Sequence, residues 1–200
     1  MTEQIKVREE ETIKNILIVG VGGQGIVLAS EVLAAVCLAA GHDVKQSEVH
    51  GMAQRGGSVT SHVRFGKEVF SPTIEKGEAD IMLSFELMES MRWLEFLSTD
   101  GTAIVNKQRI DPMTVASGKA KYPERIAEVL KVRSKHLDLV DAAALAKKAG
   151  NLKTTNVILL GVLSKHLEFD KELWVEAISN RVPPKTKEIN LKAFELGRAI

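Results

Sequence analysis

Short apolar runs alternate with longer segments of helical periodicity over the first two thirds of the chain. Residues 15–20 are apolar and β-branched up to a terminal glycine, as expected of a strand buried on both faces of a parallel sheet. From Ile26 to Ala40 apolar residues recur at helical spacing, and Gly41 is a suitable stop. The opening therefore predicts a strand, a glycine turn and a helix.

The alternation continues further along the chain. It predicts strands over 43–49, 58–65, 79–85, 101–106 and 136–140, and helices over 86–97, 123–132 and 142–149. Within 58–65 the odd positions form one face and the even positions the other. Gly66 and Lys67 resemble a hairpin turn into 68–70, which predicts an antiparallel element.

From Thr154 onward the pattern is mainly helical, with helices expected over 157–166, 171–180 and 185–198. Alternating strands and helices indicate an α/β fold. We expect a Rossmann-like, three-layer arrangement: a mainly parallel sheet with an antiparallel hairpin component and a helical C-terminal third. Residues 1–13 are expected to be a polar N-terminal leader, and 14–200 a single domain.

Composition narrows the classes of partner. The 200 residues include 27 Lys and Arg against 26 Asp and Glu, and only 4% are aromatic, so nucleic acid is not an expected partner. One cysteine, Cys37, excludes a disulfide framework within the chain and a four-thiolate iron–sulfur cluster. No targeting segment and no long apolar run is evident, so we expect no membrane span and a cytoplasmic location.

The first candidate site is the turn after the first strand, which satisfies the pattern G-x-G-x-x-G. Closely spaced glycines let backbone amides approach a phosphate at a helix N-terminus. An alternative is that they only permit a tight turn and close packing. Glu48 is placed to bind a ribose, and Gln24 would bind a ligand or cap the helix. The candidate cofactor-binding residues here are Gly20, Gly22, Gly23, Gln24, Gly25 and Glu48.

The second candidate site is the glycine-rich segment that follows. An arginine beside two glycines presents a planar cation on a permissive backbone, which suits a carboxylate or a phosphate. We expect this segment to converge with the glycine turn at the carboxyl edge of the sheet. The alternative is a surface loop whose arginine pairs with Glu48 or with a partner subunit. The candidate residues are His50, Gln54, Arg55, Gly56 and Gly57.

Other residues with reactive side chains have simpler interpretations. His62 is expected to form a structural hydrogen bond, and Cys37 to be a buried, inert thiol. His136 and His166 have no ligand spacing, so no metal site is expected. Acidic residues 86 and 89 are interpreted as favouring the first turn of a helix. No catalytic residue is assigned.

Taken together, these motifs resemble the gamma domain of pyruvate and other 2-oxoacid:ferredoxin oxidoreductases. The resemblance covers residues 14–198 and rests on 20–25, 47–59 and 61–66, with further matches at 77–80, 86–89, Asn156, Gly161 and 190–194. The glycine turn occurs in many folds, whereas the Gln-Arg-Gly-Gly segment in its context is more specific. The version at 47–57 resembles the indolepyruvate branch, in which this domain is a separate small (beta) subunit.

The resemblance implies oxidative, thiamine-dependent decarboxylation of an aryl 2-oxoacid to an aryl-acetyl-CoA, with reduction of ferredoxin. A large alpha subunit would hold thiamine diphosphate, magnesium and the iron–sulfur clusters, and this chain would be inactive alone. No cofactor is assigned to the chain by itself. Its glycine turn and Arg55 would contact coenzyme A or only dock the partner.

Three other functions remain open from the sequence. The chain could be the gamma subunit of another 2-oxoacid:ferredoxin oxidoreductase. It could also be a free-standing dinucleotide-binding reductase, although no Tyr-x-x-x-Lys or similar catalytic set is present. A regulatory nucleotide sensor is the third alternative.

Overall fold

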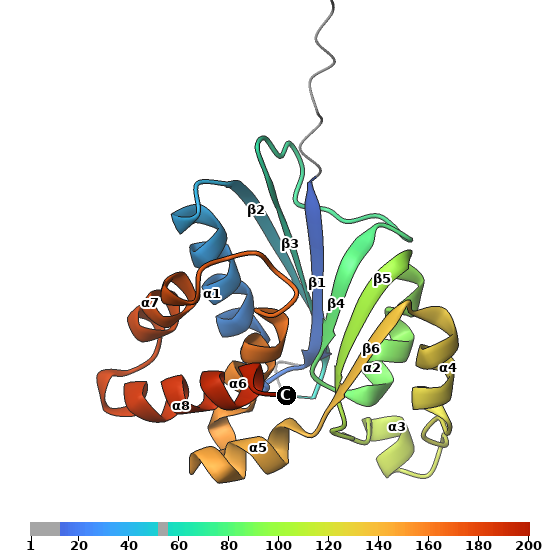
Figure 1. The fold of residues 1–200 in the computed structure, drawn as a ribbon. Coiled ribbons are helices and arrows are strands. Elements are labelled where there is room, and N and C mark those ends of the chain that lie inside the picture. The colour runs from blue at the N-terminus through green and yellow to red at the C-terminus, as the bar shows by residue number, and fades with distance from the viewer. Residues whose placement is uncertain (1–12, 52–55) are drawn as a thin grey trace, which may run out of the picture.

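A single mixed sheet forms the centre of the molecule (Figure 1). The computed structural model describes residues 13–51 and 56–200, and its strands lie in the order β2-β3-β1-β4-β5-β6. The strands are β1 (Lys14–Val21), β2 (Asp43–His50), β3 (Ser58–Gly66), β4 (Ala79–Ser84), β5 (Leu97–Asn106) and β6 (His136–Val140). Apart from Ile13, the predicted leader lies outside the described residues.

Eight α-helices and three short 3-10 helices accompany the sheet in the described part of the chain. The α-helices are α1 (Ile26–Ala39), α2 (Leu87–Arg92), α3 (Met113–Ala116), α4 (Ile126–Arg133), α5 (Ala142–Ala149), α6 (Thr155–Leu163), α7 (Lys171–Arg181) and α8 (Lys187–Arg198). The 3-10 helices are Leu94–Phe96, Leu152–Thr154 and Pro184–Thr186. The predicted helical C-terminal third is therefore confirmed.

Strand directions confirm the predicted sheet, with one correction. β1, β4, β5 and β6 are parallel neighbours, and β3 runs antiparallel between β1 and β2. The predicted hairpin from Gly66 into 68–70 is wrong. Because β1 and β2 occupy both edges of β3, no edge is left for a further strand, and the Val69 N–H donates instead to Asp43 Oδ2 at 2.8 Å.

Helices cover both faces of the sheet, as the three-layer prediction requires. α1 and α5 to α8 lie against one face, and α2 and α4 against the other (Figure 1). Strand β1 is apolar on both faces because each face packs against its own helical layer. Ile16 and Ile18 lie in the core beneath α1 and α5 to α8, and Leu17 and Val19 lie in the core beneath α2 and α4, all fully buried. An apolar run without polar alternation is thus a strand between two helical layers.

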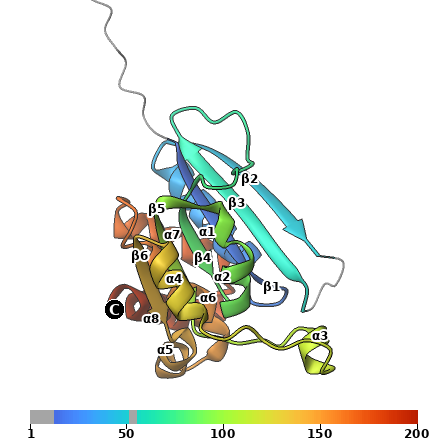
Figure 2. The same cartoon turned by 90° about the vertical axis from the view of Figure 1, so that its right-hand side faces the viewer.

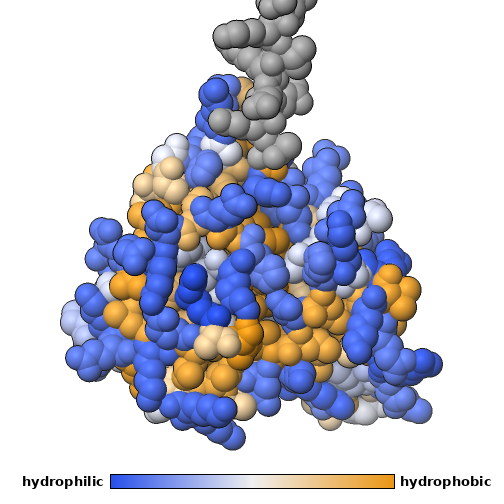
Figure 3. All heavy atoms as spheres, in the orientation of Figure 1, coloured by the Kyte–Doolittle hydropathy of each residue, from blue (hydrophilic) through white to orange (hydrophobic). Residues whose placement is uncertain are grey.

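Close packing of α6 against α8 fixes the position of these two C-terminal helices relative to each other. A Cβ on Gly161 would lie 2.3 Å from the Phe194 carbonyl oxygen, so this crossing requires glycine. The packing holds the start of α6 beside the glycine turn, where Asn156 lies against Gly25. From the side of Figure 1, the surface is largely hydrophilic, with apolar residues showing between the polar ones (Figure 3).

Candidate functional site

The glycine turn connects the end of β1 to the start of α1. Gly25, the residue before the helix, has a φ of 83°, a left-handed conformation that favours glycine. A Cβ there would also lie 2.6 Å from the Asn156 side-chain nitrogen. Gly20 lets the turn lie against Phe85, whose Cβ would be 2.8 Å from an added Cβ. Both positions therefore serve close packing, as one of the two interpretations of the motif requires.

The start of α1 is also suited to an anion. No side chain caps it, and its first turn contains no acidic residue. The first N–H groups of a helix have no partners within it and carry a partial positive charge. A helix of 14 residues that begins without a cap directly after a glycine turn can therefore accept a phosphate or carboxylate there. The packing and anion interpretations are compatible.

Gln24 holds the turn in place. Its Oε1 accepts from the Val21 N–H at 2.7 Å, and its Nε2 donates to the Phe85 carbonyl at 2.9 Å and to Gln108 Oε1 at 3.1 Å. Asn106 Nδ2 donates to the same two oxygens. The side chain thus connects the turn to the residues that follow β4 and β5. These bonds give the side chain a structural role in the turn, and its predicted contact with a ligand stays a prediction.

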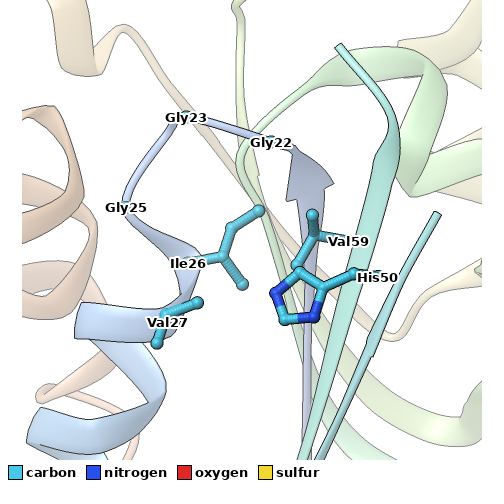
Figure 4. A pocket seen from close by; sticks show the side chains of 7 residues that line it. All are labelled: Gly22, Gly23, Gly25, Ile26, Val27, His50 and Val59. Carbon is cyan, nitrogen blue, oxygen red and sulfur yellow. The ribbon is translucent and has the colours of Figure 1, made fainter. Parts of the chain in front are cut away.

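A cavity of about 700 Å³ opens between the glycine turn, the first turn of α1 and the ends of β2 and β3. Figure 4 shows the His50 imidazole and three aliphatic side chains around it. The predicted convergence of His50 with the glycine turn is confirmed. The residues lining the cavity are Gly22, Gly23, Gly25, Ile26, Val27, His50 and Val59.

Glu48 lies behind this cavity and points toward α1. Its Oε1 accepts from Ser30 Oγ at 3.0 Å and from Gln46 Nε2 at 3.2 Å, and its Oε2 lies 3.9 Å from His50 Nε2. The carboxylate is thus hydrogen-bonded to Ser30 and Gln46, and lies near the His50 ring beyond hydrogen-bond distance. Its predicted role in binding a ribose stays a prediction.

A second cavity of about 420 Å³ lies on the other side of the turn. Its lining is mixed and includes the exposed Lys153, in the 3-10 helix before α6, and the buried Asn156 of α6. Lys153 places a cation beside the turn, so the anion-binding chemistry extends to this side. The lining residues are Gly23, Gln24, Gly25, Phe85, Gln108, Leu152, Lys153, Thr155 and Asn156.

The second motif is described only in part, because Gln54 and Arg55 lie outside the described residues. Gly57 accepts from the Gly22 N–H at 2.8 Å, so this segment contacts the glycine turn as predicted. Gly56 has a φ of 79° and lines a small cavity beside Glu86 and Glu89. The two motifs therefore meet at the carboxyl edge of the sheet.

Sequence reasoning missed how much the two acidic residues of α2 contribute. Glu86 does cap the helix, accepting from the Glu89 N–H at 2.9 Å, but both side chains are also buried. Glu89 accepts from Ser58 Oγ at 2.5 Å and pairs with Arg92 at 2.7 Å, and burial raises its pKa. Two acids directly after an apolar strand, at the edge that carries the glycine turn, were the available signal.

The predictions for His62 and Cys37 agree with the structure. His62 Nδ1 accepts from the Ile74 N–H at 3.1 Å, and burial lowers its pKa, as expected of a structural histidine. Cys37 is buried, and burial raises the pKa of its thiol. Among the described residues, no group of three or more His, Cys, Asp or Glu is arranged to hold a metal ion. Nor does any described helix have the length and apolar character to cross a membrane.

Residues 15–200 match the family model described as pyruvate ferredoxin/flavodoxin oxidoreductase. The chain belongs to this oxidoreductase family. Among its relatives, the indolepyruvate oxidoreductase subunit IorB of Thermococcus kodakarensis is 43% identical to this chain. The match covers 92% of this chain and 93% of that subunit. The common gamma subunit of the pyruvate/ketoisovalerate oxidoreductases of Pyrococcus abyssi is 30% identical. That match covers 87% of this chain and 89% of the gamma subunit.

A solved structure of the same oxidoreductase family supports the fold. The pyruvate oxidoreductase subunit PORC of Thermotoga maritima aligns with a TM-score of 0.71 at 22% identity, covering 94% of this chain and 97% of that chain. At that identity the likeness concerns the fold alone. The relatives named here are subunits of oxidoreductases, so this family member is a subunit of the 2-oxoacid:ferredoxin oxidoreductase type.

Proposed function

We propose that this chain is the small subunit of an indolepyruvate:ferredoxin oxidoreductase. The observation that carries the proposal is the 43% identity to an indolepyruvate oxidoreductase subunit over nearly the whole of both chains. The gamma subunit that serves pyruvate and ketoisovalerate is 30% identical. The difference favours the indolepyruvate branch over the other 2-oxoacid branches, as the segment 47–57 does.

The proposal divides the chemistry between two subunits. A large alpha subunit holds thiamine diphosphate, magnesium and the iron–sulfur clusters, and it passes electrons to ferredoxin. This chain has a single cysteine, and that thiol is buried, so it is unsuited to holding a four-thiolate cluster. The residues of this chain therefore bind and orient rather than transfer electrons.

Coenzyme A is the substrate that fits the groups around the glycine turn. Its phosphates suit the uncapped start of α1 and Lys153, which lines the smaller cavity. Its uncharged, partly apolar chain suits the larger cavity, whose walls are aliphatic apart from His50. Arg55, on the adjoining segment, would add a second cation. On this proposal, the turn presents coenzyme A to the acyl group held by the partner.

The substrate assignment is tested by steady-state kinetics of the two-subunit complex. With coenzyme A and ferredoxin in excess, we expect kcat/KM for indolepyruvate to exceed the values for pyruvate, 2-ketoisovalerate and 2-oxoglutarate by at least about tenfold. A preference for one of the aliphatic acids would instead make the chain the gamma subunit of another branch. Turnover of a nicotinamide cofactor by the chain alone would contradict both the indolepyruvate assignment and the assignment to another 2-oxoacid branch.

A further inference from the structure

Residues 111–121 form an arm between β5 and α4 that projects from the body of the protein. Figure 2 shows α3, within this arm, standing away from the sheet on the same side as the end of β2 and the start of β3. None of the residues of α3 is buried. The backbone hydrogen bonds recorded for 115–120 all end within 112–115, so the arm is held together locally.

The base of the arm is fixed by a buried carboxylate. Glu86, fully buried, accepts from the Ile110 N–H at 3.0 Å and from the Tyr122 hydroxyl at 2.5 Å, both through Oε1. The Arg109 guanidinium lies 4.2 Å above the Tyr122 ring. An isolated buried carboxylate is strongly unfavourable, and these donors compensate it. Both ends of the arm are thereby held at defined points, while no residue of α3 between them is buried.

The arm presents an apolar tip on a basic background. Met113 is 83% exposed, and a flexible thioether adapts readily to a partner's surface. Between 107 and 125 lie five basic and two acidic residues. In the described part of the chain, the ion pairs leave Lys107, Lys119 and Lys121 unpaired. The arm therefore offers one apolar contact point, Met113, beside lysines that an acidic partner surface would attract.

We propose that residues 111–121 dock on the large subunit of the same oxidoreductase, with Met113 in an apolar pocket and Lys119 and Lys121 against an acidic surface. The inference rests on the proposed function. It commits to this partner because the arm follows the carboxyl end of β5, the edge of the sheet that also carries the glycine turn. A large subunit that reacts with a substrate held at that turn must cover this edge.

The test is calorimetric titration of the isolated chain with the purified large subunit. We expect Met113→Glu to raise the Kd by at least about tenfold, because it places a charge in an apolar pocket. The control is Val132→Glu, at the far end of α4, where the wild-type side chain is 84% exposed. Since both wild-type side chains are largely exposed, both variants should keep the wild-type melting temperature. Equal Kd values for Met113→Glu and wild type would overturn the proposal.

Charge reversal tests the lysines separately. Lys119→Glu combined with Lys121→Glu should raise the Kd severalfold at low ionic strength, with a smaller effect at high salt. Lys67→Glu with Lys131→Glu gives the same change in net charge on exposed sites outside the arm. If the two double variants weaken binding equally, net charge alone acts and the role of the arm lysines is wrong.

The same titrations separate this inference from the proposed function. Failure of the wild-type chain to bind the large subunit would overturn both. Binding that is unchanged by Met113→Glu would overturn only the arm. Light scattering of the isolated chain supplies a further criterion: a wild-type dimer that Met113→Glu dissociates would assign the arm to a second copy of this chain and overturn the proposal.

Discussion

Buried acidic side chains carry much of the local organisation around the candidate site. Glu86 connects the start of α2 with both ends of the arm. Glu89 accepts a hydrogen bond from Ser58, which is the first residue of β3 and follows Gly57 of the glycine-rich segment. Each has its charge compensated by donors from distant parts of the chain. These two carboxylates therefore connect α2 with the arm and, through Ser58, with the second motif.

The Glu89 carboxyl predicts a pH-dependent stability. Burial raises its pKa above the ordinary value, while Ser58 and Arg92 oppose the shift. The folded state then binds the proton more tightly than the unfolded state, so wild type gains stability as the pH falls through the folded pKa. In Glu89→Gln this gain is absent. Urea unfolding from neutral pH down to the ordinary carboxyl pKa should show wild type gaining stability relative to the variant as the pH falls. A difference independent of pH would contradict this role of Glu89.

Sequence alone identified these residues but not their roles. The acidic pair was interpreted as favouring a helix N-terminus, which Glu86 does, yet burial and partners 24 and 36 residues away depend on the tertiary fold. Gln24 could not be assigned for the same reason, because its partners Phe85 and Gln108 follow other strands. By contrast, the burial of Cys37 follows from its apolar neighbours, and the structural hydrogen bond predicted for His62 is present. The burial of His62 itself was not predicted, because alternation placed it on the more polar face of the strand.

At the scale of elements, the period of the apolar residues located the strands and helices. It failed where tertiary pairing decides: 68–70 resembles a strand, but β3 already has two neighbours. It also missed α3, whose residues make no core contact and so leave no apolar pattern. The sequence placed the glycine turn between β1 and α1, but the cavities on either side of it arise from β2, β3 and the start of α6.

The 3-10 helix before α6 (Leu152–Thr154) supplies a testable element of the proposed coenzyme A site. We expect Lys153→Ala, in the complex, to raise the KM for coenzyme A severalfold with little change in kcat, because it removes a cation from the smaller cavity. Lys147→Ala on α5 is the matched control, since Lys147 is likewise exposed but lines neither cavity. The KM should not respond to it. Identical kinetics for both variants and wild type would place coenzyme A elsewhere.

At the scale of the whole molecule, three features project from one edge of the sheet. The glycine turn and the glycine-rich segment meet through the bond from Gly22 to Gly57, and the arm follows β5 at the same edge. The first two offer groups for an anionic substrate, and the arm offers a contact surface. Under the proposed function, this edge of the sheet faces the large subunit.

The most direct measurement of this account is reduction of ferredoxin by separately purified subunits, assayed singly and after mixing, with indolepyruvate and coenzyme A. We predict no turnover by this chain alone, and coenzyme A-dependent ferredoxin reduction once it is mixed with the large subunit. Turnover by this chain in isolation would contradict the account, as would full coenzyme A-dependent activity of the large subunit without it.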